Sequence, residues 1–270
     1  MSTLKSILSE KSYLPILTLN DGAPVTRENW HIRRKEMLSL LEQYSYGKTP
    51  EKPLAIRGET TFSDANCCAG KVLNEKVTVS FDTANGSFSF PVEFFIPKSP
   101  EKPPLFLKLA FRPAPDRYLP IEEVTDAGYA IAVVVYTEIM NDNHHGDYSG
   151  GIAEHFGTTS NRKPDEWGKI GMWAYSASRV LDYIIAYRND IDTSRVAVMG
   201  HSRLGKTALW CAAQDERFAA AISNDSGYGG AASSKHGSGE RVTDFLRAGS
   251  WEWFCENFKQ FSGDLEDEKP

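Results

Sequence analysis

The sequence lacks the charge distribution of a nucleic-acid-binding protein. Its 270 residues carry a net charge of −6, and no long run of Lys and Arg occurs. Because nucleic acid binding depends on clustered positive charge, we expect no nucleic acid partner. The sequence also lacks an apolar run approaching the roughly 20 residues that a membrane-spanning helix needs, so we expect no membrane partner.

The sequence has little that could bind a metal ion. Its four cysteines contain no C-x-x-C pair, which zinc sites commonly use, and Cys67 and Cys68 are adjacent. Four further candidate ligands crowd one segment at spacings typical of neither a helix nor a hairpin site: His144, His145, Asp147 and His155. We therefore predict no metal, no cofactor, and free thiols that are mostly buried.

The N-terminal segment lacks the features of a signal peptide. Lys5, Glu10 and Lys11 interrupt its apolar residues, and no small-residue cleavage site follows. The sequence as written therefore gives no sign of export. A start site placed downstream of a leader would produce the same pattern, so the compartment stays unassigned.

The first part of the chain predicts a helix followed by a hairpin. Residues 26–46 carry apolar residues at helical spacing, and Thr26 is the predicted N-cap. Residues 76–82 and 87–97 alternate apolar and polar residues on either side of an Asn-Gly sequence, Asn85-Gly86, which we take as the turn of an antiparallel hairpin.

The rest of the chain alternates strands and helices. Short, continuous apolar runs predict strands that are buried on both faces. In chain order we expect a strand over 104–111, a helix near 119–127, a strand over 129–136, a helix over 167–188, a strand over 195–200, a helix over 203–213 and a strand over 218–225. This order is typical of a mostly parallel sheet with right-handed crossovers. With the hairpin in front, it predicts an α/β-hydrolase fold in a single domain, residues 1–270, whose first 50 residues form a helical lead-in.

Residues 137–166 show no clear periodicity. A loop this long after a parallel strand is usually functional. It leaves the carboxyl end of the predicted sheet, where open α/β folds bind their ligands. We therefore expect this loop to border the site.

Residues 196–210, VAVMGHSRLGKTALW, fit two motifs that both join a strand to a helix. As G-x-x-x-x-G-K-[ST], the segment is a Walker A phosphate loop that ends in Lys206 and Thr207. As a strand, a sharp turn and a helix, it is a nucleophile elbow built on Ser202. A phosphate loop wraps phosphates with backbone N–H groups, but the four variable positions here are mostly bulky. We therefore favour the elbow and keep nucleotide binding as an alternative.

The elbow departs in one respect from the usual pattern, G-x-S-x-G. Its second glycine, Gly205, comes one position late. We expect Gly200 and Gly205 to relieve crowding at the bend. The helix that follows would direct its N–H groups and its positive end toward a developing oxyanion.

The segment GHSRLGKTALW resembles the elbow of the glucuronoyl esterases (carbohydrate esterase family 15), which has the pattern G-x-S-R-x-G-K and the same late glycine. The resemblance extends over roughly residues 120–260, through AAQDERFAAAISNDSGYGGAA, WGKIGMWAYSASRVLDYI and RAGSWEWFCENF. It implies an α/β-hydrolase that cleaves esters of 4-O-methyl-glucuronic acid in plant cell-wall xylan. It also implies a carbohydrate ester as substrate and a secreted or periplasmic location.

The resemblance assigns roles to five residues. Ser202 would be the nucleophile, Arg203 would stabilise the oxyanion, and Asp225, where many members have Glu, would be the triad acid. Lys206 and Glu240 would contact sugar hydroxyls. From the residues alone other interpretations stay open: Ser202 as a helix N-cap, Asp225 as a loop cap, and the other three as exposed charges. Three nearby aromatics would either stack on the sugar or pack in the core: Trp251, Trp253 and Phe254.

A serine esterase of this fold also needs a histidine that follows the acid in the chain. None of the six histidines matches the position that the family uses. We therefore expect the final strands and the histidine loop to lie outside this sequence, and residues 1–270 alone to hydrolyse no ester, unless His236 is the base. The hypotheses are a glucuronoyl esterase, an acetyl or cinnamoyl esterase, a carbohydrate-binding remnant without turnover and, last, a nucleotide-binding protein.

Overall fold

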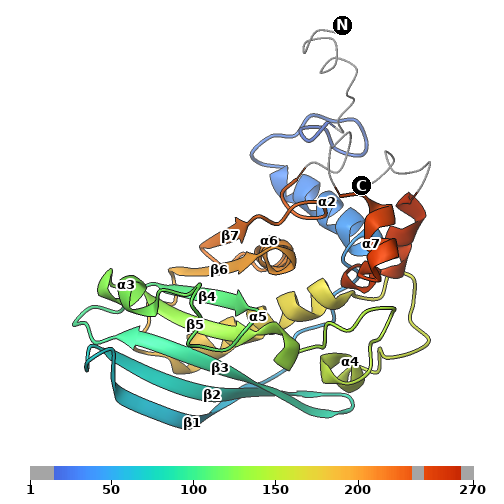
Figure 1. Cartoon of the computed structure of the whole chain (residues 1–270). Coiled ribbons are helices and arrows are strands. Elements are labelled where there is room, and N and C mark those ends of the chain that lie inside the picture. Colours follow the sequence, from blue (N-terminus) through green and yellow to red (C-terminus); the bar gives the residue numbers. More distant parts are fainter. Residues whose placement is uncertain (1–14, 233–239, 263–270) are drawn as a thin grey trace, which may run out of the picture.

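The structure, a computed structural model, describes residues 15–232 and 240–262, and among these residues seven strands form one sheet (Figure 1). The strands are β1 (Ile56–Cys67), β2 (Val72–Thr83), β3 (Gly86–Pro97), β4 (Leu105–Ala110), β5 (Ala130–Val135), β6 (Val196–His201) and β7 (Ala220–Asn224). Their order across the sheet is β1-β2-β3-β5-β4-β6-β7. The pairs from β1 to β5 are antiparallel and those from β5 to β7 are parallel. The predicted combination of a hairpin and a parallel α/β sheet is confirmed.

The hairpin differs from the prediction in its turn. Strands β2 and β3 pair up to Thr83 and Gly86, so the turn is Ala84-Asn85, one residue earlier than expected. Gly86 has a φ of 110°, and its carbonyl oxygen accepts a hydrogen bond from the Thr83 hydroxyl at 2.8 Å. Strand β1 was not predicted, because most of its side chains are exposed and it lacks an apolar alternation.

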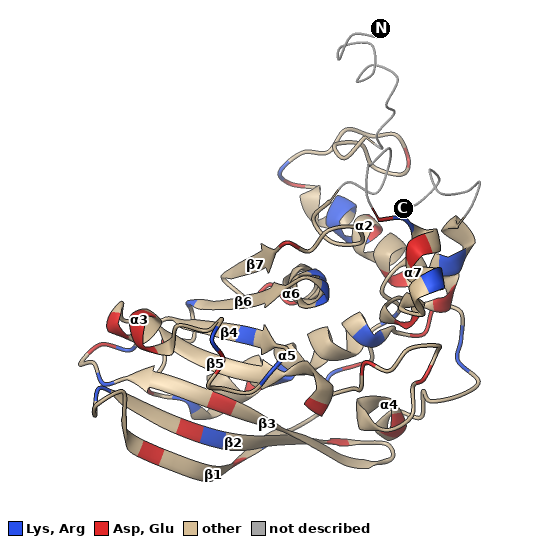
Figure 2. Cartoon of the chain, in the orientation of Figure 1, with Lys and Arg blue, Asp and Glu red and all other residues tan. Residues whose placement is uncertain are grey.

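The parallel half matches the predicted strands to within a few residues. Strands β5 and β6 carry no charged side chains, as Figure 2 shows. Strand β7 was predicted as a buried strand, but most of its residues are exposed, and Ile222 is 39% exposed. The reason is its place in the sheet: among the described strands it pairs only with β6.

The helices follow the predicted order. They are α2 (Trp30–Tyr44), α3 (Ile121–Asp126), α4 (Gly151–His155), α5 (Lys169–Tyr187), α6 (Arg203–Gln214) and α7 (Val242–Ala248), with short 3-10 turns η1 (Tyr136–Glu138), η2 (Trp251–Trp253) and η3 (Glu256–Phe261). Helix α2 begins later than predicted, because Thr26 and Asn29 bond to each other in the turn before it and Asn29 is the N-cap. No described helix is long and apolar enough to cross a membrane.

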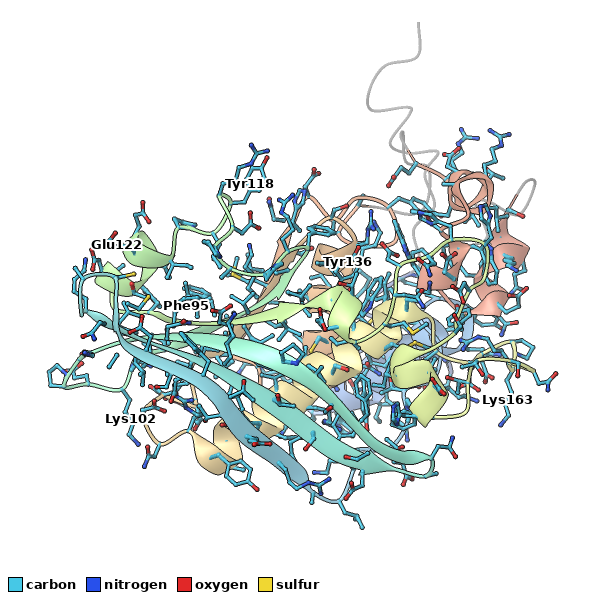
Figure 3. All side chains as sticks on the ribbon, turned by 60° about the horizontal axis from the view of Figure 1, so that its bottom comes forward. Phe95, Lys102, Tyr118, Glu122, Tyr136 and Lys163 are labelled. Carbon is cyan, nitrogen blue, oxygen red and sulfur yellow. The ribbon has the colours of Figure 1, made fainter. Side chains whose placement is uncertain are left out.

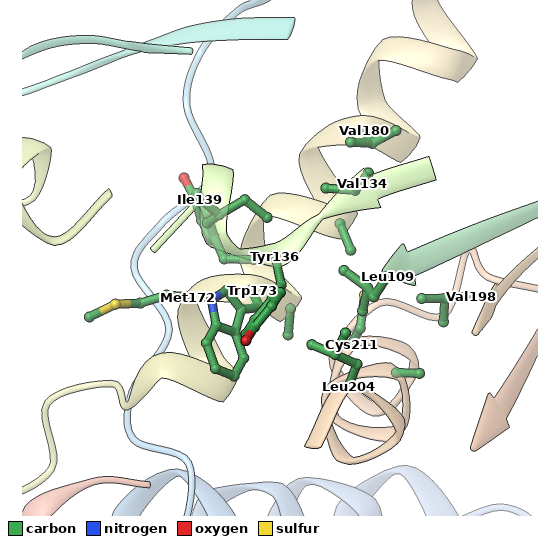
Figure 4. Close-up of a cluster of buried hydrophobic side chains, with 14 of the residues drawn as sticks. Leu109, Val134, Tyr136, Ile139, Met172, Trp173, Val180, Val198, Leu204 and Cys211 are labelled. Carbon is green, nitrogen blue, oxygen red and sulfur yellow. The ribbon is translucent and has the colours of Figure 1, made fainter. Parts of the chain in front are cut away.

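The main core lies between the sheet and the helices α5 and α6. Leu109, Val134 and Val198 project from adjacent strands toward Leu204 of α6 and the side chains of α5 (Figure 4). Each is at most 1% exposed, and burying such a side chain stabilises the fold by about 1.5–3 kcal/mol. A smaller cluster on the opposite face packs under α3 and includes Phe95 (Figure 3). The core therefore fixes the positions of β4, β5 and β6, whose carboxyl ends border the predicted site.

Candidate active site

Ser202 lies at the bend between β6 and α6. Its φ is 55° and its ψ is −126°, and its side chain makes no capping hydrogen bond to the helix. A non-glycine residue in such a conformation costs on the order of 1–3 kcal/mol, and strain of this kind gathers at functional sites. The strand, sharp turn and helix have the geometry predicted for an elbow, and the interpretation of Ser202 as a side-chain N-cap is wrong.

The two glycines of the motif explain its unusual spacing. A Cβ on Gly200 would lie 2.1 Å from the carbonyl oxygen of Leu204. A Cβ on Gly205 would lie 3.1 Å from the carbonyl oxygen of Asn224 at the end of β7. The second glycine therefore stands where the first turn of α6 comes close to the end of β7.

The hydrogen bonds in the first turn of α6 argue against a phosphate loop. Lys206 is 3% exposed, and its Nζ donates to the carbonyl oxygen of Ser226 at 2.6 Å. The Thr207 hydroxyl is buried and donates to the carbonyl oxygen of Arg203 at 3.0 Å. The backbone N–H groups of Gly205 and Lys206 both donate to the carbonyl oxygen of Ser202. The Thr207 hydroxyl and the two N–H groups that a phosphate loop would use are thus engaged inside the fold, and Lys206 is not a surface cation.

Asp225 lies beside Ser202 at the carboxyl edge of the sheet. His201 is opposite Asn224 in the register of β6 and β7, so Ser202 and Asp225 are the next residues on neighbouring strands. The Ser202 N–H donates to the carbonyl oxygen of Asn224 at 2.9 Å. Asp225 is exposed and has a φ of 47°. Its carboxylate forms no ion pair with Arg203 among the described residues.

Lys206 and Glu240 come together although they are 34 positions apart in the sequence. A Cβ on Gly227 would lie 3.4 Å from Glu240 Oε2, which places this carboxylate over the loop that Lys206 binds. Burial lowers the pKa of Lys206, and the nearby charge of Glu240 opposes that shift. Glu240 itself is exposed. The two side chains flank the segment that carries Asp225.

Arg203 is the first residue of α6, and its guanidinium contacts one carboxylate and two aromatic rings. Its Nη1 forms an ion pair with Asp142, and its side chain is 27% exposed. The guanidinium carbon lies 4.5 Å from the Trp253 ring centroid and 5.5 Å from that of Phe111. The interpretation of Arg203 as a solvated charge is therefore wrong. Sequence reasoning missed Asp142, whose one signal was its place in the long loop 137–166.

Two of the three aromatics predicted either to stack on the sugar or to pack in the core are buried. Trp253 is 8% exposed and Phe254 is fully buried, so both pack in the core. Trp251 is partly exposed, and the Lys259 ammonium lies 3.3 Å from its ring centroid. Core packing is confirmed for the first two.

Comparisons with known proteins agree with this geometry. A family model described as "Glucuronyl esterase, fungi" matches residues 77–267. A carbohydrate esterase, MZ0003, from an unknown prokaryotic organism is 32% identical over 94% of this chain and 67% of its own length. The solved structure of a glucuronoyl esterase from Solibacter usitatus has a TM-score of 0.82 and 30% identity over 95% of this chain and 75% of its own. The chain belongs to the glucuronoyl esterase family.

The esterase family also contains relatives that are much longer than this chain. A 4-O-methyl-glucuronoyl methylesterase from Phanerochaete carnosa is 30% identical over 78% of this chain but only 48% of its own length. The chain thus spans about half the length of this relative. Another glucuronoyl esterase, from Teredinibacter turnerae, has a TM-score of 0.83 with 66% of its own chain covered.

No described histidine hydrogen-bonds the Ser202 hydroxyl, although an esterase of this type needs a base there. The ring of His201 is exposed, and its Nδ1 lies 3.1 Å from Asn224 Nδ2. His155 packs against Phe88, with ring centroids 5.2 Å apart. His236 lies outside the described residues.

A cavity of about 620 Å³ lies next to the elbow at the same sheet edge. Its walls come from the end of β4 and the residues after it, together with His201 and Asn224. These two residues directly precede Ser202 and Asp225. Lys108 in its wall is half-buried, and this burial lowers its pKa. The cavity therefore borders the two residues that the sequence predicts as nucleophile and acid, and His201 is the histidine among its lining residues.

Proposed function

We propose that this chain carries the nucleophile, the oxyanion site and the sugar-binding residues of a glucuronoyl ester hydrolase. The observation that carries the proposal is the strained turn at Ser202, whose hydroxyl is not used to cap α6. Family membership supports the substrate class, since similar proteins are named 4-O-methyl-glucuronoyl methylesterases. The substrate is an ester of glucuronic acid in xylan.

In the proposed reaction, Ser202 Oγ attacks the ester carbonyl carbon. The negative charge that develops on the carbonyl oxygen faces the N-terminus of α6, where the first N–H groups have no partner within the helix. The Arg203 guanidinium adds a positive charge next to this point. The alcohol leaves, and water then cleaves the acyl-enzyme to release the free uronic acid.

The proton of Ser202 passes to a histidine, and Asp225 orients its imidazole. Two observations support this role: Asp225 is exposed at the same sheet edge as Ser202, and its carboxylate forms no ion pair with Arg203 in the described part of the chain. The base lies outside the described residues, and His236 is the histidine of the printed sequence that meets this condition.

Lys206 and Glu240 hold the sugar while the ester faces Ser202. Lys206 has three donors, and the carbonyl oxygen of Ser226 takes one. Burial lowers its pKa and leaves the ammonium poorly hydrated, so a sugar hydroxyl competes with little water. A hydrogen bond to a charged group contributes about 1.5–3 kcal/mol.

Chemical rescue tests the proposal. Residues 1–270 are assayed on benzyl D-glucuronate with and without added imidazole, which would stand in for a base outside the described residues. We expect hydrolysis that rises with imidazole concentration and disappears in Ser202→Ala. Hydrolysis that Ser202→Ala leaves unchanged, or none under any condition, would refute the proposal.

His236→Gln and a binding titration separate the remaining alternatives. Hydrolysis without imidazole that His236→Gln removes would identify His236 as the base. Binding of D-glucuronate with no serine-dependent hydrolysis would indicate a carbohydrate-binding protein instead. Equal rates on benzyl glucuronate and on a small acetyl ester would favour the less specific esterase.

A further inference from the structure

We propose that Asp142 is a positioning residue that holds the Arg203 guanidinium at the oxyanion site; this inference rests on the proposed function. Asp142 lies in the loop after β5, 61 positions before Arg203 in the sequence. Its side chain is 8% exposed. A carboxylate this deeply buried needs hydrogen-bond partners. Its partners are Arg203, Tyr136 and Trp253.

Both carboxylate oxygens of Asp142 are engaged. Oδ2 accepts hydrogen bonds from Arg203 Nη1 and, at 3.0 Å, from the hydroxyl of Tyr136, the first residue of η1. Oδ1 accepts a hydrogen bond from Trp253 Nε1 at 2.8 Å. Three elements, η1, α6 and η2, thus meet at one carboxylate. The carboxylate cannot rotate without losing a partner.

The guanidinium has little freedom around this contact. The Trp253 ring that donates to Asp142 also stacks near the guanidinium, and the Phe111 ring lies on another side. The Arg203 Nε is buried and has no hydrogen-bond partner among the described residues. Asp142 is therefore the ion-pair partner that fixes the direction of the Arg203 side chain.

Asp142 is itself supported from both sides. Lys169, the first residue of α5, is fully buried, and its Nζ donates to the Asn143 carbonyl oxygen at 2.6 Å and to Asn141 Oδ1 at 3.2 Å. The fully buried Glu252 carboxylate lies 3.8 Å from Lys169 Nζ. Glu252 directly precedes Trp253. One buried ion pair thus links both segments that hold Asp142.

The physical reason for this arrangement is preorganisation. A donor stabilises an oxyanion only if it already points at the place where the charge develops. A flexible arginine would have to be ordered during the reaction. The negative charge of Asp142 weakens the field of Arg203, so its contribution is orientation rather than charge.

A double-mutant cycle tests this with the Ser202-dependent, imidazole-supported rate. We expect Arg203→Met to lower kcat by about 100-fold, as loss of one oxyanion donor does. Asp142→Ala should lower kcat by about tenfold with KM little changed, and should cost nothing further in the Arg203→Met background. Asp147→Ala removes a carboxylate from the same loop that does not contact Arg203, so it should retain the rate. Losses from Asp142→Ala and Arg203→Met that multiply in the double variant would overturn the inference.

A second measurement does not depend on activity. The Nε–H resonance of Arg203, identified by its absence in Arg203→Met, should exchange slowly with solvent in the wild-type chain. Asp142→Ala should speed this exchange at least tenfold, and Asp147→Ala should not. An unchanged resonance in Asp142→Ala would overturn the inference whatever the activity. A wild-type chain without Ser202-dependent hydrolysis would refute the proposed function, while the resonance still decides whether Asp142 holds Arg203.

Discussion

Strands β6 and β7 are parallel neighbours that each lead into a residue with positive φ, yet they differ in burial. The side chains of β6 alternate between buried and half-buried up to His201, whereas those of β7 are mostly exposed. Ser202 follows the first strand and Asp225 the second. The proposed nucleophile is thus held by a strand with neighbours on both sides, and the proposed acid by a strand with one described neighbour. We expect β6 and Ser202 to tolerate fewer substitutions than β7 and Asp225.

The largest difference between the two sides should appear in the rate of hydrolysis. Ser202→Ala removes the attacking oxygen and should reduce the imidazole-supported rate to the background. Asp225→Ala keeps the nucleophile, so we expect a loss that is about 100-fold smaller. Both rates are measured on benzyl D-glucuronate. Equal losses would contradict the assignment of Asp225 as an orienting acid.

The next largest difference should separate the two glycines of the elbow. Gly200→Ala places a Cβ 2.1 Å from a backbone oxygen, so the turn must shift, and we expect a loss of about 3 kcal/mol in the free energy of unfolding. Gly205→Ala faces a contact of 3.1 Å and gains about 1 kcal/mol of helix propensity, so it should cost under about 1 kcal/mol. Urea denaturation measures both. If Gly205→Ala lowered the free energy of unfolding more than Gly200→Ala, β7 would pack more tightly on α6 than a 3.1 Å contact implies.

A smaller difference should separate core truncations on the two strands. Val198 of β6 is fully buried, and Val198→Ala should lower the free energy of unfolding by about 2 kcal/mol. Ile222 of β7 is 39% exposed, so Ile222→Ala should cost less than about 1 kcal/mol although it removes more atoms. Thermal denaturation of the two variants compares them. Equal losses would mean that β7 is covered in solution.

The smallest effect concerns Lys206, which links the two sides by donating from α6 to Ser226 after β7. Its pKa is lowered by burial from the usual 10.5, so the folded chain binds fewer protons than the unfolded chain between that lowered pKa and 10.5. Stability from this group therefore rises with pH in that window. We expect the stability of the wild type to increase relative to Lys206→Met between pH 8 and pH 10. A constant difference in urea denaturation at the two pH values would contradict the lowered pKa of Lys206.

Local patterns were enough to predict the parallel half of the fold and the elbow. Continuous apolar runs marked β4, β5 and β6, because strands buried on both faces leave no place for polar residues. The two glycines of the elbow are needed because a Cβ would lie close to Leu204 or to the end of β7. This steric requirement is visible in the sequence motif itself. The same patterns failed at β1, which has little apolar surface, and at the start of α2, where Thr26 bonds to Asn29 instead of capping the helix.

The partners of the charged residues needed the folded chain. Asp142 and Arg203 meet across 61 positions, and Lys169 reaches Asn141 and Asn143, on either side of Asp142, across 28 and 26 positions. No local pattern marks such pairs, because an ion pair depends on which elements the sheet order brings side by side. The burial of Lys206 and the exposure of β7 likewise follow from strand order rather than composition. A motif can show which side chains do chemistry, whereas their direction and neighbours depend on packing between segments far apart in the chain.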